Sequence, residues 1–253
     1  MPECPVFVAS DAHLGAAPPE HEEAFTNWLA STPDRASRVI LNGDLFDFWF
    51  ESRWGTTAGH DRVLQVLREV VATGLPVTLL GGNHDWWGGR FLREEVGVEF
   101  LHDPVVRDLA GYRAFVGHGD GLGPGDQGYH VLKWVLRSRL TRFAYSLLPP
   151  RVGDRVAQGV SSTRERWDAA PERDRDSAAV LSDWAAEKLG AEPELDLVIL
   201  GHTHVPEVRE VGEGRWYVNA GDWVRHCTYA VLERGVPPRI VAWKRPDPNG
   251  LVR

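Results

Sequence analysis

Cysteine is scarce in this chain: Cys4 and Cys227 are the only two among its 253 residues. Their spacing indicates neither a zinc knot nor a disulfide framework. Proteins that fold without structural disulfides are typical of reducing compartments. The low cysteine content therefore predicts a cytoplasmic protein.

Long apolar runs are lacking as well. No segment approaches the ~20 consecutive apolar residues that a helix needs to cross a bilayer. The first residues, Met1-Pro2-Glu3-Cys4, do not form a basic region followed by an apolar stretch, so we expect no signal peptide.

Positive charge is also limited. Lysine and arginine together number 28 against 36 aspartates and glutamates, which gives a formal net charge of -8. A general nucleic-acid binder needs a broadly basic face to neutralise phosphates. This composition argues against one, and we expect no nucleic-acid partner.

Apolar sequence is nevertheless plentiful enough for a sizeable core, because hydrophobic residues make up 43% of the chain. A length of 253 residues suits one large α/β domain or one domain with an insertion. We therefore predict a single domain over residues 1–253.

The first third of the chain alternates between predicted strands and helices. Apolar runs at 5–9, 38–41 and 76–80 are predicted strands. Apolar residues at helical spacing within 24–29 and 63–71 predict helices between them. Such alternation builds a buried sheet covered by helices.

The C-terminal part has a different pattern. Short strands are predicted at 205–211, 215–218, 228–232 and 239–243, with turn residues between them. We expect these four strands to form a second, more antiparallel sheet that packs on the first.

The segment 122–175 fits neither pattern. Apolar residues recur at three- and four-residue steps from Tyr129 to Leu147, which predicts a helix that ends at Pro149-Pro150. Between Asp126 and Arg166 the sequence has eight basic side chains against three acidic ones. We predict that 122–175 is a helical insertion lying over the active site as a lid; the alternative is a helix packed on the core with a solvated charged face.

Polar groups gather in five short motifs, four of which follow an apolar run typical of a strand. The motifs are Asp11-Ala12-His13, Gly43-Asp44-Leu45-Phe46-Asp47, Gly82-Asn83-His84-Asp85, Gly117-His118-Gly119-Asp120 and Gly201-His202-Thr203-His204. Loops beyond strand ends are where ligand-binding groups collect in open α/β sheets. A single Asp-x-His motif has little meaning, but five such groups predict one shared site.

The residue types suit a pair of divalent cations. Two ions ~3.5–4 Å apart activate water and neutralise phosphate oxygens, and they need oxygen and imidazole ligands with one ligand shared. Asp44 is the natural shared ligand, because its carboxylate can bind both ions. The candidate ligands are Asp11, His13, Asp44, Asn83, His118, His202 and His204. We expect Asp47 and Asp85 to orient these ligands instead of binding metal, and the role of His226, just after Gly221-Asp222-Trp223, stays open.

The ordered set of motifs resembles the calcineurin-like metallophosphoesterase superfamily, and the likeness extends from Val6 to about Tyr229. The resemblance implies an α/β (α+β) fold of four layers, αββα, in which two central mixed β-sheets are flanked by helices. It also implies two divalent metal ions, most often manganese, with iron, zinc and magnesium as alternatives.

The resemblance further implies how the ligands divide between the ions. One ion would be held by Asp11, His13, Asp44 and His204. The other would be held by Asp44, Asn83, His118 and His202. The implied catalytic residues are Asn83, His84 and Asp85, with His84 beside the scissile phosphate as proton donor or charge stabiliser and Asp85 behind it.

Within the superfamily the chain resembles the UDP-2,3-diacylglucosamine hydrolases, which are pyrophosphatases of lipid A synthesis. The likeness rests on Gly43-Asp44-Leu45-Phe46-Asp47-Phe48-Trp49, on His118-Gly119-Asp120 with the insertion after it, and on Gly201-His202-Thr203-His204 followed by Pro206. It implies cleavage of a nucleotide-lipid to a lipid monophosphate and UMP under a lid that holds the acyl chains. The substrate-binding residues so implied are Asp126, Tyr129, Arg155 and Arg164, and the lid arginines suggest peripheral contact with the cytoplasmic face of a membrane.

One position departs from that hydrolase family, whose members commonly carry arginine where this chain has His84. A general phosphodiesterase or phosphatase without lipid preference is therefore the alternative function. A non-catalytic scaffold is a minor alternative, which the seven filled ligand positions disfavour.

Overall fold

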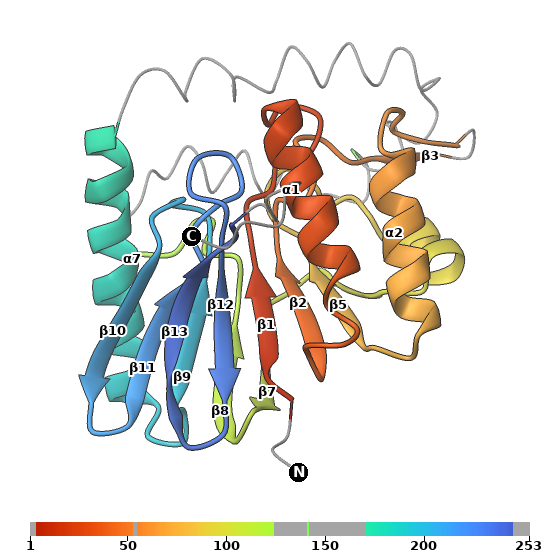
Figure 1. Ribbon diagram of the computed structural model, residues 1–253. Coiled ribbons are helices and arrows are strands. Elements are labelled where there is room, and N and C mark those ends of the chain that lie inside the picture. The colour runs from red at the N-terminus through yellow and green to blue at the C-terminus, as the bar shows by residue number, and fades with distance from the viewer. Residues whose placement is uncertain (1–3, 53–54, 124–140, 142–170, 245–253) are drawn as a thin grey trace.

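The structure is a computed structural model that describes residues 4–52, 55–123, 141 and 171–244. Two central sheets dominate it (Figure 1). The six-stranded sheet has the order β13 (Val236–Ala242), β12 (Thr228–Glu233), β1 (Val6–Ala9), β2 (Arg38–Asn42), β5 (Val77–Leu80) and β6 (Glu99–Leu101). The five-stranded sheet has the order β10 (Glu207–Gly212), β11 (Arg215–Asn219), β9 (Leu197–Leu200), β8 (Tyr112–Val116) and β7 (Val105–Leu109). Two short strands, β3 (Glu51–Ser52) and β4 (Gly55–Thr56), pair antiparallel with each other.

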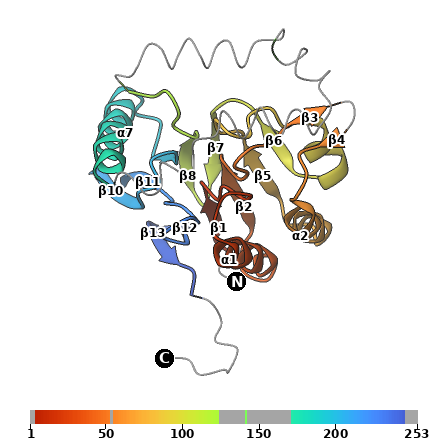
Figure 2. The same cartoon turned by 90° about the horizontal axis from the view of Figure 1, so that it is seen from above.

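Helices cover the outer faces of both sheets. Helices α1 (Pro19–Ala30) and α2 (Asp61–Ala72) lie on one side of the molecule and α7 (Pro171–Ala191) on the other (Figure 2). A π-helical turn, η1 (Leu92–Val96), packs beside α2. None of the described helices is long and apolar enough to span a membrane.

Side chains that alternate along each strand pack into two different cores, one on each face of the sheet. On β1, Phe7 faces the helical core under α1 and α2, whereas Val8 faces the core between the sheets. On β9, Ile199 belongs to the core between the sheets and Val198 to the core under α7. Successive strand residues point to opposite faces, so each sheet is buried on both sides. The four-layer αββα arrangement predicted from the sequence is confirmed.

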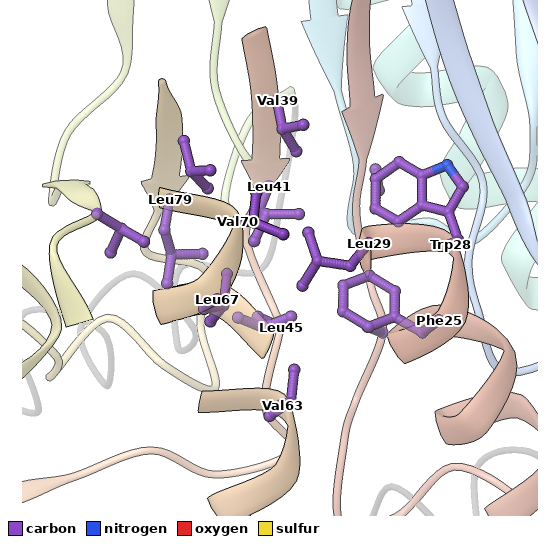
Figure 3. Close-up of a cluster of buried hydrophobic side chains, with 14 of the residues drawn as sticks. Phe25, Trp28, Leu29, Val39, Leu41, Leu45, Val63, Leu67, Val70 and Leu79 are labelled. Carbon is purple, nitrogen blue, oxygen red and sulfur yellow. The ribbon is translucent and has the colours of Figure 1, made fainter. Parts of the chain in front are cut away.

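The core under α1 and α2 is built largely from the apolar residues that predicted those helices. Phe25, Trp28 and Leu29 of α1 are almost fully buried. Leu67 of α2 belongs to the same core cluster, and Figure 3 shows the side chains of both helices turned toward the strands. The predicted helices at 24–29 and 63–71 are therefore present as α1 and α2.

Parallel strands bring the motif loops to one edge. Strands β1, β2 and β5 are parallel neighbours in the first sheet, and β8, β9 and β11 are parallel neighbours in the second. The motif loops follow the carboxyl ends of β1, β2, β5, β8 and β9. This arrangement places the five motifs within reach of one another.

The predicted C-terminal sheet is partly wrong. Strands β10 and β11 do lie in the second sheet, but β12 pairs antiparallel with β1 and extends the first sheet together with β13. Backbone pairing between β1 and β12 spans more than two hundred residues, so no local pattern assigns β12 to a sheet. The predicted lid falls mostly outside the described residues, and within 171–175 the chain already belongs to α7.

Candidate metal centre

The motif loops hold their side chains through an uncommon backbone conformation. Among the described non-glycine residues, only seven have a positive φ, and five of these are predicted ligands. The five are Asp11 (53°), His13 (43°), Asp44 (50°), His202 (69°) and His204 (61°). Left-handed φ values in non-glycine residues are strained and tend to occur at functional sites. The strain points to one shared site at the strand ends.

The first group of candidate ligands comes from two segments that lie far apart in the sequence. One ligand atom each from Asp11, His13 and His204 lies within 4.8 Å of the others. Nε2 of His204 is 3.6 Å from Oδ1 of Asp11. The rings of His13 and His204 stack with their centroids 5.0 Å apart. Asp11 and His13 are buried, as a preformed cation site requires.

The second group comprises Asp44, His118 and His202, whose ligand atoms also lie within 4.8 Å of one another. Nε2 of His118 is 3.2 Å from Oδ2 of Asp44. Nδ1 of His118 lies 2.9 Å from the carbonyl oxygen of Asn42, so it carries the proton that this hydrogen bond needs. That tautomer leaves Nε2 of His118 free to bind a cation.

Asp44 links the two groups. Its Oδ2 lies 3.8 Å from Nε2 of His13 as well as next to His118. Asn83 adds a neutral oxygen: its Oδ1 is buried and has no hydrogen-bond partner in the described part of the chain. A hard divalent cation would supply the partner that this buried amide oxygen lacks.

The electrostatics of the site also suit cations. Burial disfavours charge on both Asp44 and His118, yet their proximity holds the pKa of Asp44 well below its usual range and raises that of His118. Burial, together with the neighbouring His118, lowers the pKa of His202 to about 4. Buried carboxylates need compensating positive charge. Protons supply part of it here, and divalent ions fit the same positions because metal ligands bind deprotonated.

His84 lies beside the ligands with part of its ring open to solvent. Its Nδ1 is 2.6 Å from the carbonyl oxygen of Asp47, and its side chain is 18% exposed. Its ring centroid is 4.8 Å from that of His13, and its backbone N–H donates to Asp44 at 2.9 Å. The His84 side chain is therefore partly accessible to solvent beside the candidate ligands.

Among the described residues, Asp85 accepts hydrogen bonds from the backbone of the motif loops and not from the ring of His84. Its fully buried carboxylate accepts hydrogen bonds from the backbone N–H groups of Leu45 and Gly82, both at 2.7 Å, and of Asp44 at 3.3 Å. Burial and the nearby Asp44 charge raise the pKa of Asp85 to about 7. Within the described residues, the hydrogen-bond partner of the His84 ring is Asp47.

Sequence reasoning missed Asp222, a fully buried carboxylate 3.2 Å from Nδ1 of His204. The available signal was its place in the loop that follows the strand predicted at 215–218. The four predicted substrate-binding residues, Asp126, Tyr129, Arg155 and Arg164, lie outside the described residues.

Comparisons with known proteins agree with this geometry. The profile of the family described as "Calcineurin-like phosphoesterase" matches residues 4–206. A UDP-2,3-diacylglucosamine hydrolase from Porphyromonas gingivalis is 28% identical over 90% of this chain and 94% of its own length. The hydrolase of the same name from Ralstonia nicotianae is 30% identical over 87% of this chain and 84% of its own length.

Among solved structures, a dimetal phosphatase from Danio rerio aligns with 96% of this chain and 100% of its own, with 13% identity and a TM-score of 0.48. The family assignment rests on the profile and on the relatives. This chain belongs to the calcineurin-like phosphoesterase family. It is a metal-dependent hydrolase, as its ligand groups and its hydrolase relatives indicate.

Proposed function

We propose that this chain cleaves the pyrophosphate bond of UDP-2,3-diacylglucosamine or a closely related nucleotide-lipid, giving a lipid monophosphate and UMP. The observation that carries the proposal is the clustering of the candidate Asp and His ligands, combined with relatives of that name aligned over 84–94% of their length. An isolated metal centre would support any phosphoester. The end-to-end match with these relatives favours the nucleotide-lipid.

The proposed centre holds two divalent ions, and manganese is the proposed metal. The first ion would be bound by Asp11, His13, Asp44 and His204, and the second by Asp44, Asn83, His118 and His202. Such ions supply a water of lowered pKa and a positive charge for the phosphate oxygens. The mixture of carboxylate, amide and imidazole ligands accepts manganese and also iron, zinc or magnesium.

His84 is the proposed substrate-contacting residue of the protein itself. With Nδ1 held by the Asp47 carbonyl at 2.6 Å, its Nε2 is the nitrogen left for a phosphate oxygen. A hydrogen bond there would stabilise the charge that develops on the phosphate or donate a proton. Asn83 would hold its ion, and Asp85 would keep the loop of His84 in place through Leu45 and Gly82.

The remaining parts of the proposal concern the lipid. We propose that 122–175 forms a lid, with Asp126 and Tyr129 near the sugar and Arg155 and Arg164 binding phosphate or an anionic membrane surface. The protein would then work in the cytoplasm, in peripheral contact with the membrane. These assignments rest on the sequence pattern and on the resemblance.

A substrate panel tests the proposal. The purified protein, loaded with manganese, is given UDP-2,3-diacylglucosamine in detergent micelles, UDP-N-acetylglucosamine without acyl chains, and bis(p-nitrophenyl) phosphate. We expect UMP release from the lipid substrate to exceed turnover of the other two by at least about 100-fold in kcat/KM, which is ~3 kcal/mol of differential transition-state binding. Equal turnover of the acyl-free nucleotide sugar would instead assign a general phosphodiesterase.

Matched variants separate the metal centre from non-specific effects. Asp44→Asn should abolish turnover of every substrate, because it removes the shared ligand. Asp34→Asn makes the same chemical change at an exposed position and should leave activity unchanged. Normal turnover by Asp44→Asn would exclude the proposed centre.

A further inference from the structure

A loop beyond the family match supports the proposed centre. The loop at 220–227 connects β11 to β12, and the family profile ends at residue 206. Because β11 runs parallel to β9, this loop leaves the sheet at the same edge as the His202–His204 loop. It is therefore placed next to the ligands of the first ion.

Backbone contacts fix the loop at that place. The N–H of Trp223 donates to the carbonyl oxygen of Asp11 at 3.1 Å. At the base of the loop, Nδ2 of Asn219 donates to the carbonyl oxygen of Gly201 at 3.0 Å. The loop is thus tied to both segments that carry ligands of the first ion. Trp223 and Asn219 are fully buried, so these contacts are shielded from water.

Asp222 is the acidic residue at the centre of this loop. Its Oδ1 accepts the backbone N–H groups of Arg225 at 2.8 Å and His226 at 2.9 Å. Its Oδ2 lies 3.2 Å from Nδ1 of His204. Two backbone donors thus fix the carboxylate so that one oxygen faces the His204 ring.

This contact selects a tautomer. An ionised carboxylate can only accept a hydrogen bond, so the ring of His204 carries its proton on Nδ1. The lone pair is then on Nε2, which lies 3.6 Å from Oδ1 of Asp11 in the first ligand group. A carboxylate behind a ligating histidine also makes the ligand more basic.

The second ion has a different arrangement. Nδ1 of His118 faces the backbone carbonyl of Asn42 at 2.9 Å, and no carboxylate takes this place in the described residues. His204 therefore has a carboxylate behind it, whereas His118 has a backbone carbonyl. A substitution at Asp222 would change the hydrogen bond of His204 and leave that of His118 in place.

We infer that Asp222 is a positioning residue that orients His204 for the first ion and leaves the second ion unaffected. The inference rests on the proposed two-ion centre. It goes beyond the ligand set, because it assigns a residue outside the family match to one of the two ions and predicts that the ions have separately adjustable affinities.

Metal binding by Asp222→Asn tests the inference. With its oxygen kept by the two backbone donors, asparagine turns its NH2 group toward His204. Nδ1 must then accept a hydrogen bond, and the proton moves to Nε2, where it blocks the ion. Equilibrium dialysis against a series of Mn²⁺ concentrations, read by elemental analysis, should show one ion at wild-type affinity and one about 10- to 100-fold weaker. Two ions at wild-type affinity would overturn the inference, whereas a wild-type protein that binds fewer than two ions would overturn the proposed function.

Two further variants show whether Asp222 acts through His204. In a His204→Gln background, adding Asp222→Asn should weaken the first ion no further, since the interaction is already lost. A further loss would contradict the inference. His226→Gln removes a half-exposed imidazole 3.3 Å from Oδ1 of Asp222 but leaves the carboxylate, and both ions should bind as in the wild type. A loss equal to that of Asp222→Asn would assign the effect to the loop as a whole.

A measurement on the unaltered protein covers the case in which Asp222→Asn does not fold. Nitrogen NMR of the Zn²⁺-loaded wild type, with His204 assigned from the His204→Gln spectrum, reports which ring nitrogen carries the proton. We expect the proton on Nδ1 and the metal on Nε2. The opposite tautomer would overturn the inference.

Discussion

Glu99 on β6 and Arg107 on β7 join the outer edges of the two central sheets. Nη1 of Arg107 is 2.8 Å from Oε2 of Glu99, and Nη2 is 3.0 Å from Oε1. Oε2 of Glu99 also accepts a hydrogen bond from Thr78 at 2.7 Å. The first sheet ends at β6 and the second at β7, so this two-point ion pair closes the sandwich on that side.

The ion pair predicts a pH-dependent part of the stability. The hydrogen bond from Arg107 lowers the pKa of Glu99 from 4.5 to about 2, against the opposing effect of burial. Its stabilisation should therefore be complete above about pH 4.5 and lost as the pH falls toward 2. Urea unfolding of the wild type and of Glu99→Gln should show different midpoints at pH 6 that converge near pH 2. The difference in midpoint at pH 6 should be small, because Glu99 is partly exposed to solvent.

The control for that experiment is Glu213→Gln, which makes the same change in the exposed β10–β11 turn. Its midpoint should follow the wild type at every pH. A Glu99→Gln midpoint that parallels the wild type from pH 6 to pH 2 would contradict the assignment.

Asp85→Asn should destabilise the protein. The substitution points an NH2 group at backbone N–H groups that now donate to a carboxylate, so a buried donor loses its acceptor. We expect a loss of about 1–3 kcal/mol in the free energy of unfolding. Denaturant titration of the metal-free proteins measures it, with Asp34→Asn as the exposed control. An unchanged stability would show that the loops of Leu45 and Gly82 do not depend on the Asp85 carboxylate.

Removal of single ligands should separate the two ions. Asp44→Asn is expected to lose affinity for both, because Asp44 belongs to the group with His118 and its Oδ2 lies 3.8 Å from Nε2 of His13 in the other group. His202→Gln should lose the second ion and keep the first. Chelation should abolish turnover in the wild type, and added Mn²⁺ should restore it. Two tightly bound ions in Asp44→Asn would be incompatible with a shared carboxylate.

His84 should act on turnover and not on metal binding. His84→Gln is expected to lower kcat by about 10²–10³-fold, as for other single donors to a developing charge, and to retain both ions. His84→Arg should keep more activity than His84→Gln, because an arginine can also donate to a phosphate oxygen and is common at this position in the hydrolases that the chain resembles. If both variants lose an ion, His84 is a ligand instead.

The sequence predicted that the candidate ligands lie together, because their positions follow from strand ends. Asp11 and His204 are far apart in the chain, yet each follows a buried strand, and the strands end at one edge. The strained φ values of these ligands were not predictable, since aspartate and histidine rarely adopt them without tertiary support.

Long-range contacts account for what the sequence did not reveal. Strand β12 has the pattern of any short buried strand, and only its pairing with β1 places it in the first sheet. In the sequence alone, Asp222 looks like an ordinary turn residue. Only the parallel pairing of β11 with β9 places its loop beside the His202–His204 loop. A residue that supports a motif loop through long-range contacts, such as Asp222, is therefore harder to predict than a residue within a motif.

The position of Gly82 has no room for a side chain. A Cβ at Gly82 would lie 2.1 Å from Oδ1 of Asp44 and 2.6 Å from its backbone nitrogen. Gly82→Ala must therefore displace Asp44, and we expect weaker binding of both ions together with lower activity. Gly190→Ala is the matched control: a Cβ there meets nothing within 4 Å, and alanine in the last turn of α7 should stabilise the helix by no more than about 0.5–1 kcal/mol. Metal titration and thermal unfolding of both variants test the pair, and full metal affinity in Gly82→Ala would show that the loop can yield without moving Asp44.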